Sequence, residues 1–277
     1  MIVRLGSIEL DCPSVMGVIN VTPDSFSDGG KFFTPPHALR QAGRLVDAGA
    51  EILDIGGEST RPGAASVGEQ EELDRVIPII EAIAADFDVA VSIDTSKPRV
   101  MREAVAAGAA MINDVCALQA DGALAAAAEL QKPVCLMHMQ GQPRTMQAEP
   151  HYDDVVDEVI QFLASRVTQC VDKGIGKDLL VVDPGFGFGK TLAHNVELLA
   201  NLRQLQRIGC PVLIGVSRKS PLGVITGRGV DDLLPASIAA AVVAVMQGAQ
   251  IVRAHDVAET VDALCVARCL IESGKNL

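Results

Sequence analysis

The chain has 277 residues, of which 49% are hydrophobic and 21% charged, and its formal net charge at pH 7 is −12. This acidity disfavours nucleic-acid binding, because phosphate recognition depends on clustered Lys and Arg. No apolar run reaches the roughly 20 uncharged residues that a membrane-spanning helix needs, and the N-terminal residues show no export signal, so we expect a cytoplasmic protein that binds no membrane.

Short runs rich in Val and Ile alternate with longer stretches of helical periodicity along the whole chain. This alternation predicts βαβ units and a parallel sheet. We expect eight strands, each followed by a helix, at residues 15–20, 51–55, 89–94, 110–114, 133–138, 178–183, 211–216 and 250–253. Eight units match an α/β fold of the (β/α)8 TIM-barrel type better than a doubly wound sheet, with one domain spanning residues 1–277.

The residues before the first predicted barrel strand form two short apolar runs around Gly6 and Ser7. They predict a short N-terminal β-hairpin that covers the N-terminal mouth of the barrel. Three Gly-Ala pairs, beginning at Gly49, Gly108 and Gly248, each lie just before a predicted strand. Each of these glycines is expected to end a helix in the left-handed conformation. The seven cysteines include no CxxC pair and predict free, mostly buried thiols.

Every predicted barrel strand ends at a polar residue, in chain order Asn20, Asp54, Asp94, Asn113, His138, Asp183, Ser217 and Arg253. A buried strand does not need a polar end. In a parallel barrel, however, the carboxyl ends of all strands converge on one face, where active sites form. The pattern therefore predicts an enzyme.

Two long segments, NVTPDSFSDGGKFF (residues 20–33) and GGESTRPGA (residues 56–64), follow the first and second of these strands. Connections of this kind usually have 2 to 6 residues, and long ones on this face are commonly mobile lids. Turn formation accounts for their Pro, Gly, Ser and Asp residues. It does not account for Phe26 and Arg61, which suit a loop that closes over an aromatic acid.

The acidic and amide side chains Asp94, Asn113, Asp114 and Asp183 are expected to share one pocket. Carboxylates accept from ring N–H and amino groups, and Asn both donates and accepts, so the set suits a nitrogen heterocycle. The alternative for Asp94 or Asp183 alone is a helix cap.

The segment DPGFGFGK (residues 183–190) places three glycines where the backbone must approach a ligand closely, with Phe186 and Phe188 as candidates for stacking. Two later motifs, SRKS (residues 217–220) and RAHD (residues 253–256), follow the seventh and eighth strands. Lys219, Arg253 and His255 there predict an anion site, which an acidic protein needs for a phosphorylated ligand.

Taken together, NVTPDSFSDGG, GGESTRPGA, IDTSKP, INDV, LMHMQG, DPGFGFGK, SRKS and RAHDV resemble, in order and over the whole chain, the dihydropteroate synthase family. The resemblance implies a (β/α)8 barrel that condenses 6-hydroxymethyl-7,8-dihydropterin pyrophosphate with p-aminobenzoate. The products would be 7,8-dihydropteroate and pyrophosphate, with Mg2+ as cofactor and sulfonamides as inhibitors. It also implies a homodimer formed through helices far from the loops, for which the small-residue stretch 236–246 is suited.

Residue roles follow from the matching motif positions. The resemblance implies a pterin site made of Asp94, Asn113, Met137, Asp183, Gly215, Lys219 and Arg253. It implies a p-aminobenzoate site made of Phe26, Thr60, Arg61, Pro62, Phe188 and Ser220. Asn20, Arg253 and His255 would hold the diphosphate, Asn20 would also contact the metal, and Asp24 and Asp28 would order the first loop. Asp94, Lys219, Arg253 and Asn20 are the expected catalytic residues.

Two other functions remain open at the level of the sequence. A methyltetrahydrofolate-type methyltransferase would share the pterin end of such a barrel but has no use for the cationic SRKS and RAHD motifs. A catalytically silent pterin-binding homologue would be expected to have lost loop residues, yet Asn20, Phe26 and Arg61 are present.

Overall fold

The computed structural model describes residues 2–21, 35–60, 63–142 and 145–274. Eight of its strands form one parallel sheet in the order β8-β7-β6-β5-β4-β3-β10-β9. Val182 bridges Val212 in parallel fashion, which joins β8 to the chain just before β9 and closes the sheet into a barrel. The strands are β3 (Ser14–Asn20), β4 (Ile52–Gly56), β5 (Ala90–Asp94), β6 (Met111–Asp114), β7 (Val134–Met137), β8 (Leu180–Asp183), β9 (Leu213–Gly215) and β10 (Ile251–Ala254).

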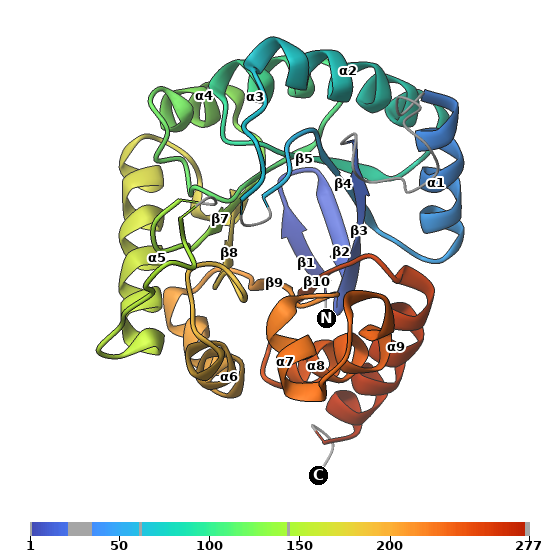
Figure 1. Cartoon of the computed structure of the whole chain (residues 1–277). Coiled ribbons are helices and arrows are strands. Elements are labelled where there is room, and N and C mark those ends of the chain that lie inside the picture. The colour runs from blue at the N-terminus through green and yellow to red at the C-terminus, as the bar shows by residue number, and fades with distance from the viewer. Residues whose placement is uncertain (1, 22–34, 61–62, 143–144, 275–277) are drawn as a thin grey trace.

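A ring of helices surrounds this barrel (Figure 1). The helices are α1 (Pro35–Asp47), α2 (Glu69–Asp86), α3 (Pro98–Ala106), α4 (Ala123–Leu130), α5 (Val155–Asp172), α6 (Leu192–Ala200), α7 (Ser220–Thr226), α8 (Leu234–Met246) and α9 (Val257–Gly274). The predicted (β/α)8 barrel is confirmed. The sequence did not indicate that β9 is followed by two helices, α7 and α8. No helix in the described ranges is long and apolar enough to cross a bilayer.

The three Gly-Ala pairs end helices as predicted. Gly49, Gly108 and Gly248 have φ values of 95°, 117° and 99°. In each pair the glycine N–H donates to the carbonyl three residues earlier and the following alanine N–H donates to the carbonyl five residues earlier, as in Ala50 to Leu45 at 2.9 Å. Only glycine adopts this conformation without strain, so the same dipeptide repeatedly turns the chain from a helix into the barrel.

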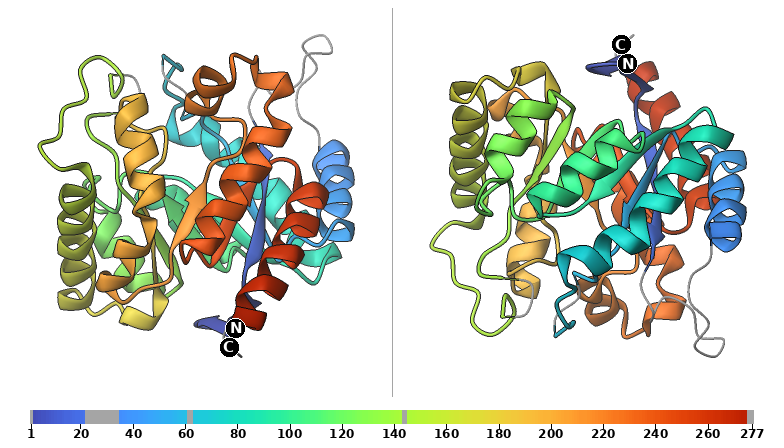
Figure 2. Two further views of the ribbon diagram at one scale, coloured as in Figure 1. Left: turned by 90° about the horizontal axis from the view of Figure 1, so that it is seen from below. Right: turned by 90° about the horizontal axis from the view of Figure 1, so that it is seen from above.

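The predicted N-terminal hairpin is formed by β1 (Ile2–Leu5) and β2 (Ile8–Asp11). It lies beside the C-terminal part of α9 at one end of the molecule (Figure 2), where Arg268 donates to Asp11 at 2.6 Å. Its buried side chains pack on a layer of apolar residues from the beginnings of the barrel strands; this cluster includes Leu5, Ile8, Leu10, Met16, Ile52, Met111, Val181, Leu213 and Ile251. The N-terminal mouth is therefore sealed with hydrophobic side chains, and polar groups are left to the opposite mouth.

Candidate active site

The inward-facing positions of the strands change from apolar to polar along the barrel axis. Because side chains alternate along a strand, residues two apart share a face. Ile52 and Asp54 form such a pair in β4, as do Met111 and Asn113 in β6 and Ile251 and Arg253 in β10. A hydrophobic floor thus lies below a polar layer that is built from distant parts of the chain.

Strand register places the predicted pterin residues around this polar layer. Asp94 pairs in register with Asn113, Met137 with Asp183, and Gly215 with Arg253. Asn113 and Asp183 are each 5% exposed. A Cβ at Gly215 would lie 3.6 Å from Nζ of Lys219, so this glycine leaves the lysine room over the barrel mouth.

Arg253 is the centre of the charge arrangement. Its Nε donates to Oδ2 of Asp54 at 2.7 Å, and its Nη2 donates to Oδ2 of Asp94 at 3.1 Å. Asn113 donates to the same Asp54 oxygen at 3.0 Å. Asp54 is fully buried, and its Oδ1 has no hydrogen-bond partner within the described part of the chain. We expected Asp54 only as a polar strand end, whereas it lies inside the barrel and holds both Arg253 and Asn113.

Two acidic groups of this layer, Asp94 and Asp183, have pKa values raised above their usual range. Burial and the neighbouring charge of Asp54 raise the pKa of Asp94 to about 8, and Arg253 opposes this shift. Burial also raises the pKa of Asp183, against the attraction of Lys219. Such carboxyl groups respond strongly to a bound ligand, because a donor or a positive charge stabilises the ionised form.

Lys219 extends from the N-terminal end of α7 across the site. Its Nζ donates to the carbonyl of Phe186 and lies 4.5 Å from the ring centroid of Phe188, a cation–π contact. Burial lowers the pKa of Lys219 to about 8, while Asp183 favours the charged form. The ammonium therefore joins the carboxylate layer to the Phe188 ring.

The two phenylalanines of the Gly-rich segment have different surroundings. Phe188 is half-buried beside Lys219, as a site residue would be. Phe186 is 1% exposed and packs in the main hydrophobic core. Its prediction as a stacking residue is therefore wrong, and only its carbonyl reaches the site.

The glycines of the same segment are required by close approach to the protein itself. Gly185 has a φ of 68°, and a Cβ there would lie 1.9 Å from the carbonyl oxygen of His138. At Gly189 a Cβ would lie 2.4 Å from the carbonyl oxygen of Gln140. We predicted close approach of this backbone to a ligand, whereas these contacts are made with the segment that follows β7.

Lys190 is a buried residue that sequence reasoning missed. It is 3% exposed, and its Nζ lies 3.0 Å from Nδ1 of His138 and donates to the carbonyls of Gly185 and Phe188 at 3.0 and 2.9 Å. Burial lowers the pKa of Lys190 to about 7 and that of His138 to about 3. The neutral His138 ring therefore accepts from Lys190, which ties the Gly-rich segment to the chain that follows β7. The sequence signal that could have identified Lys190 is its position directly after three closely spaced glycines.

Asp114 does not belong to the pocket in which we expected it. It faces the opposite side of β6 from Asn113 and accepts from the backbone N–H groups of Cys116 and Leu118, both at 2.8 Å. It also bonds the hydroxyl of Ser96. Adjacent strand residues point to opposite faces, so only one of the pair reaches the barrel interior.

His255, expected to join Lys219 and Arg253 in an anion site, contacts Ser217. Its backbone N–H donates to Oγ of Ser217 at 3.2 Å, and its Nδ1 lies 3.0 Å from the same oxygen. The hydroxyl can then donate its proton to Nδ1, which places the ring proton on Nε2. In this tautomer Nε2 is the hydrogen-bond donor.

The remaining predicted residues lie on the rim or outside the described ranges. Asn20 ends β3, and a Cβ at Gly56 would lie 3.7 Å from both its Oδ1 and Oδ2 of Asp94. Thr60 is partly exposed and Ser220 is exposed at the start of α7. Asp24, Phe26, Asp28, Arg61 and Pro62 lie outside the described residues.

Known proteins resemble this chain over nearly its whole length. A family model described as pterin binding enzyme matches residues 16–255. Dihydropteroate synthase of Escherichia coli K12 is 52% identical over 270 residues, which cover 98% of this chain and 96% of that protein. The Haemophilus influenzae dihydropteroate synthase is 52% identical over 259 residues, or 94% of each chain.

Solved structures agree with these sequence relatives. A Yersinia pestis dihydropteroate synthase in complex with a sulfonamide drug superposes with a TM-score of 0.94 at 52% identity, covering 98% of this chain and all of that one. A Xanthomonas albilineans dihydropteroate synthase in complex with 7,8-dihydropteroate superposes with a TM-score of 0.87 at 48% identity, covering 98% of each.

Proposed function

This chain belongs to the dihydropteroate synthases of the pterin-binding enzyme family, and from that membership we propose that it joins 6-hydroxymethyl-7,8-dihydropterin pyrophosphate to p-aminobenzoate. The observation that carries the proposal is the bridge of Arg253 between Asp54 and Asp94 in a layer shared with Asn113. This layer offers a heterocycle both donors and acceptors, and it offers a leaving anion a cation.

The pterin end of the substrate is expected to bind within the polar layer. Asp183 and Asp94 supply acceptors for ring N–H and amino groups, and Asn113 supplies both a donor and an acceptor. Met137 and Gly215 border this space at the ends of β7 and β9. The charge of Lys219 is favoured by Asp183, and we expect its ammonium to donate to a ring nitrogen or carbonyl.

The diphosphate is expected at the mouth of the barrel, near Arg253 and His255. We expect Nε2–H of His255 and the guanidinium of Arg253 to donate to it. Asn20 offers a carboxamide oxygen, which fits Mg2+ because this ion takes few protein ligands and completes its shell with water and substrate phosphates. Among the described residues no group of three or more His, Cys, Asp or Glu could hold a metal ion by itself. When bound, Mg2+ would offset the charge that develops on the departing diphosphate.

The reaction then proceeds by displacement at the pterin methylene carbon. The C–O bond breaks with its electron pair leaving on pyrophosphate, and the positive charge that develops is delocalised into the pterin ring. In this proposal the carboxylate of Asp94 stabilises that charge electrostatically. The lone pair of the aniline nitrogen forms the new C–N bond, and its proton is lost to water, because an amine of such weak basicity needs no strong general base.

The p-aminobenzoate site is proposed on the rim formed by Thr60, Phe188 and Ser220. Phe188 already stacks against the Lys219 ammonium, which places an aromatic face next to the pterin layer. Arg61, Pro62 and Phe26 complete the set in our proposal, with Asp24 and Asp28 ordering the first loop. Sulfonamides are expected to compete for the same site, since a related enzyme binds such a drug.

A homodimer in the cytoplasm is the expected form of the protein. Exposed apolar side chains on the adjacent helices α8 and α9 support the dimer: Val243, Met246, Val266 and Leu270. An exposed apolar group of this kind favours protein association. Light scattering of the purified protein, whose chain mass is 29.0 kDa, tests the assembly.

The function is tested by measuring pyrophosphate release from the pterin substrate with and without p-aminobenzoate. We expect release and dihydropteroate formation, identified by mass spectrometry, only when both substrates are present, and a loss of turnover when Mg2+ is chelated. A protein that binds the pterin pyrophosphate but forms no dihydropteroate with any divalent metal would contradict the proposal. It would favour the silent-homologue or methyltransferase alternatives.

The pH dependence of kcat/KM for the pterin substrate should show a narrow maximum near pH 8. The pKa of Asp94 is raised to about 8 and that of Lys219 is lowered to about 8, so below this pH Asp94 binds a proton and above it Lys219 loses one. Since kcat/KM reports the free enzyme, both losses reduce it. The variant Lys219→Arg keeps its charge at high pH and should lose the alkaline decline. A decline that persists unchanged in this variant would assign it to another group.

A further inference from the structure

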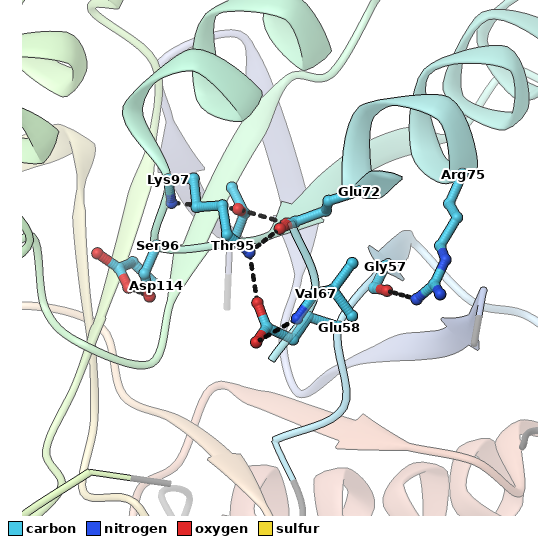
Figure 3. Close-up of polar contacts among 9 residues, drawn as sticks. All are labelled: Gly57, Glu58, Val67, Glu72, Arg75, Thr95, Ser96, Lys97 and Asp114. Atoms are coloured by element: carbon cyan, nitrogen blue, oxygen red, sulfur yellow. Dashed lines mark hydrogen bonds and ion pairs between the residues drawn. The ribbon is translucent and has the colours of Figure 1, made fainter. Parts of the chain in front are cut away.

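A second cluster of charged side chains lies where the segments that follow β4 and β5 meet α2 (Figure 3). Its centre is Lys97, whose Nζ pairs with the carboxylates of both Glu58 and Glu72. Glu72, on α2, is 1% exposed, and its other oxygen accepts from the hydroxyl of Thr95 at 2.6 Å. None of these contacts takes part in the reaction described above.

The cluster is more than a surface ion pair. A carboxylate as buried as that of Glu72 is strongly destabilising unless it is paired and hydrogen-bonded. Burial disfavours the charge of Lys97, but hydrogen bonds with Glu58 and Glu72 outweigh it, so the pKa of this lysine is raised. Lys97 is therefore a fixed positive charge that the buried Glu72 holds in place.

Glu58 connects this fixed charge to the segment between β4 and α2. One Glu58 oxygen pairs with Lys97, and the other accepts from the backbone N–H of Val67 at 3.2 Å. Arg75 donates to the carbonyl of Gly57 at 2.7 Å, and a Cβ at Gly57 would lie 2.7 Å from Val76 on α2. Glu58 thus connects both ends of the segment 57–67 to Lys97. In the sequence it lies two residues before Thr60.

The cluster is also continuous with the polar layer of the barrel. Asp94 directly precedes Thr95, and the hydroxyl of Ser96 bonds Asp114, the neighbour of Asn113. The short segment from Asp94 to Lys97 therefore contacts the pterin residues at one end and the β4–α2 segment at the other.

We propose that Lys97, fixed by Glu72, is a positioning residue for p-aminobenzoate, because it holds Glu58 and through it the backbone that leads to Thr60. The inference rests on the proposed function, in which Thr60 borders the p-aminobenzoate site. In this role Lys97 and Glu58 do not need to contact either substrate. They act through the placement of the residues that do.

The principal test is the variant Glu58→Ala, because it leaves the Lys97–Glu72 pair intact. We expect KM for p-aminobenzoate to rise about tenfold, since a small misplacement of a substrate-binding residue has effects of this order. KM for the pterin pyrophosphate should stay within about twofold of wild type. A role in overall stability alone would not separate the two constants in this way.

A second variant, Lys97→Met, should show the same selective increase and a lower melting temperature, because Glu72 then lacks its partner. The double variant Glu58→Ala/Lys97→Met should raise KM for p-aminobenzoate no further than Lys97→Met alone. Both substitutions break the same contact between Lys97 and Glu58. If Lys97→Met does not fold, Glu58→Ala decides the question. The matched control is Glu103→Ala, which breaks the exposed pair of Glu103 with Arg99 on α3 and should leave both KM values unchanged.

An unchanged KM for p-aminobenzoate in Glu58→Ala, or an equal rise in both constants, would overturn the positioning role. Wild-type turnover in the same assay separates this result from the proposed function. A wild-type protein that forms no dihydropteroate would overturn both inferences, whereas an active wild type with an unaffected Glu58→Ala variant would overturn only this one.

Discussion

Replacement of Arg253 by methionine is expected to reduce kcat/KM by about 10²- to 10³-fold, the usual effect of removing one donor that stabilises developing charge. The guanidinium bridges Asp54 and Asp94 and lies where the leaving diphosphate is proposed to bind. Methionine keeps much of the volume but offers neither charge nor donors. Steady-state kinetics with both substrates measures the loss.

The same substitution should also lower the free energy of unfolding, by about 3 kcal/mol, because it leaves buried carboxylates without their partner. We choose the low end of the usual range since the Arg253 side chain is 21% exposed. Adding Asp54→Asn should restore most of this stability and none of the turnover, which separates the two effects. Wild-type turnover in the single variant would contradict the assignment of Arg253 to the reaction.

Replacement of Asp94 by asparagine is expected to have the opposite effect on stability and a similar effect on activity. The amide cannot offset the charge that develops on the pterin ring, so kcat should fall by about 10²- to 10³-fold. Asparagine has nearly the same size and removes the repulsion between Asp94 and Asp54, so stability at pH 8 should be unchanged or higher. Kinetics and chemical denaturation of the same preparation test both expectations.

The pH dependence of the free energy of unfolding is a second test of the raised pKa of Asp94. Its pKa is raised from 3.8 in the unfolded chain to about 8, so the folded state binds more protons between these values and loses stability as the pH rises from about 4 to about 8. This contribution should disappear in Asp94→Asn. The control is Asp88→Asn, an exposed residue just before the other end of β5, which should keep wild-type activity and pH dependence. An Asp94→Asn variant with full activity would contradict the proposed mechanism.

Much of the fold could be predicted because its signals are local. Alternating apolar runs and helical periods located the eight barrel strands, and the Gly-Ala pairs marked helix ends because the left-handed conformation belongs mainly to glycine. The polar residues at strand ends could be assigned to one face, since a parallel barrel brings those ends together. Predicted and observed strand limits agree to within one residue except near residues 178 and 211, where Lys177–Leu179 form a 3-10 turn and β9 begins at Leu213.

Only the tertiary structure decided which polar residues meet and which face they occupy. Asn113 and Asp114 are neighbours in sequence, yet pleating sends one into the barrel and the other to a turn. The bridge between Asp54 and Arg253 joins residues 199 positions apart, and the cluster of Glu58, Glu72 and Lys97 joins α2 to the segments that follow β4 and β5. Sequence alone determined element types because backbone preferences and side-chain periodicity act over a few residues. Partners of buried charges depend instead on strand register and barrel closure, which are properties of the whole chain.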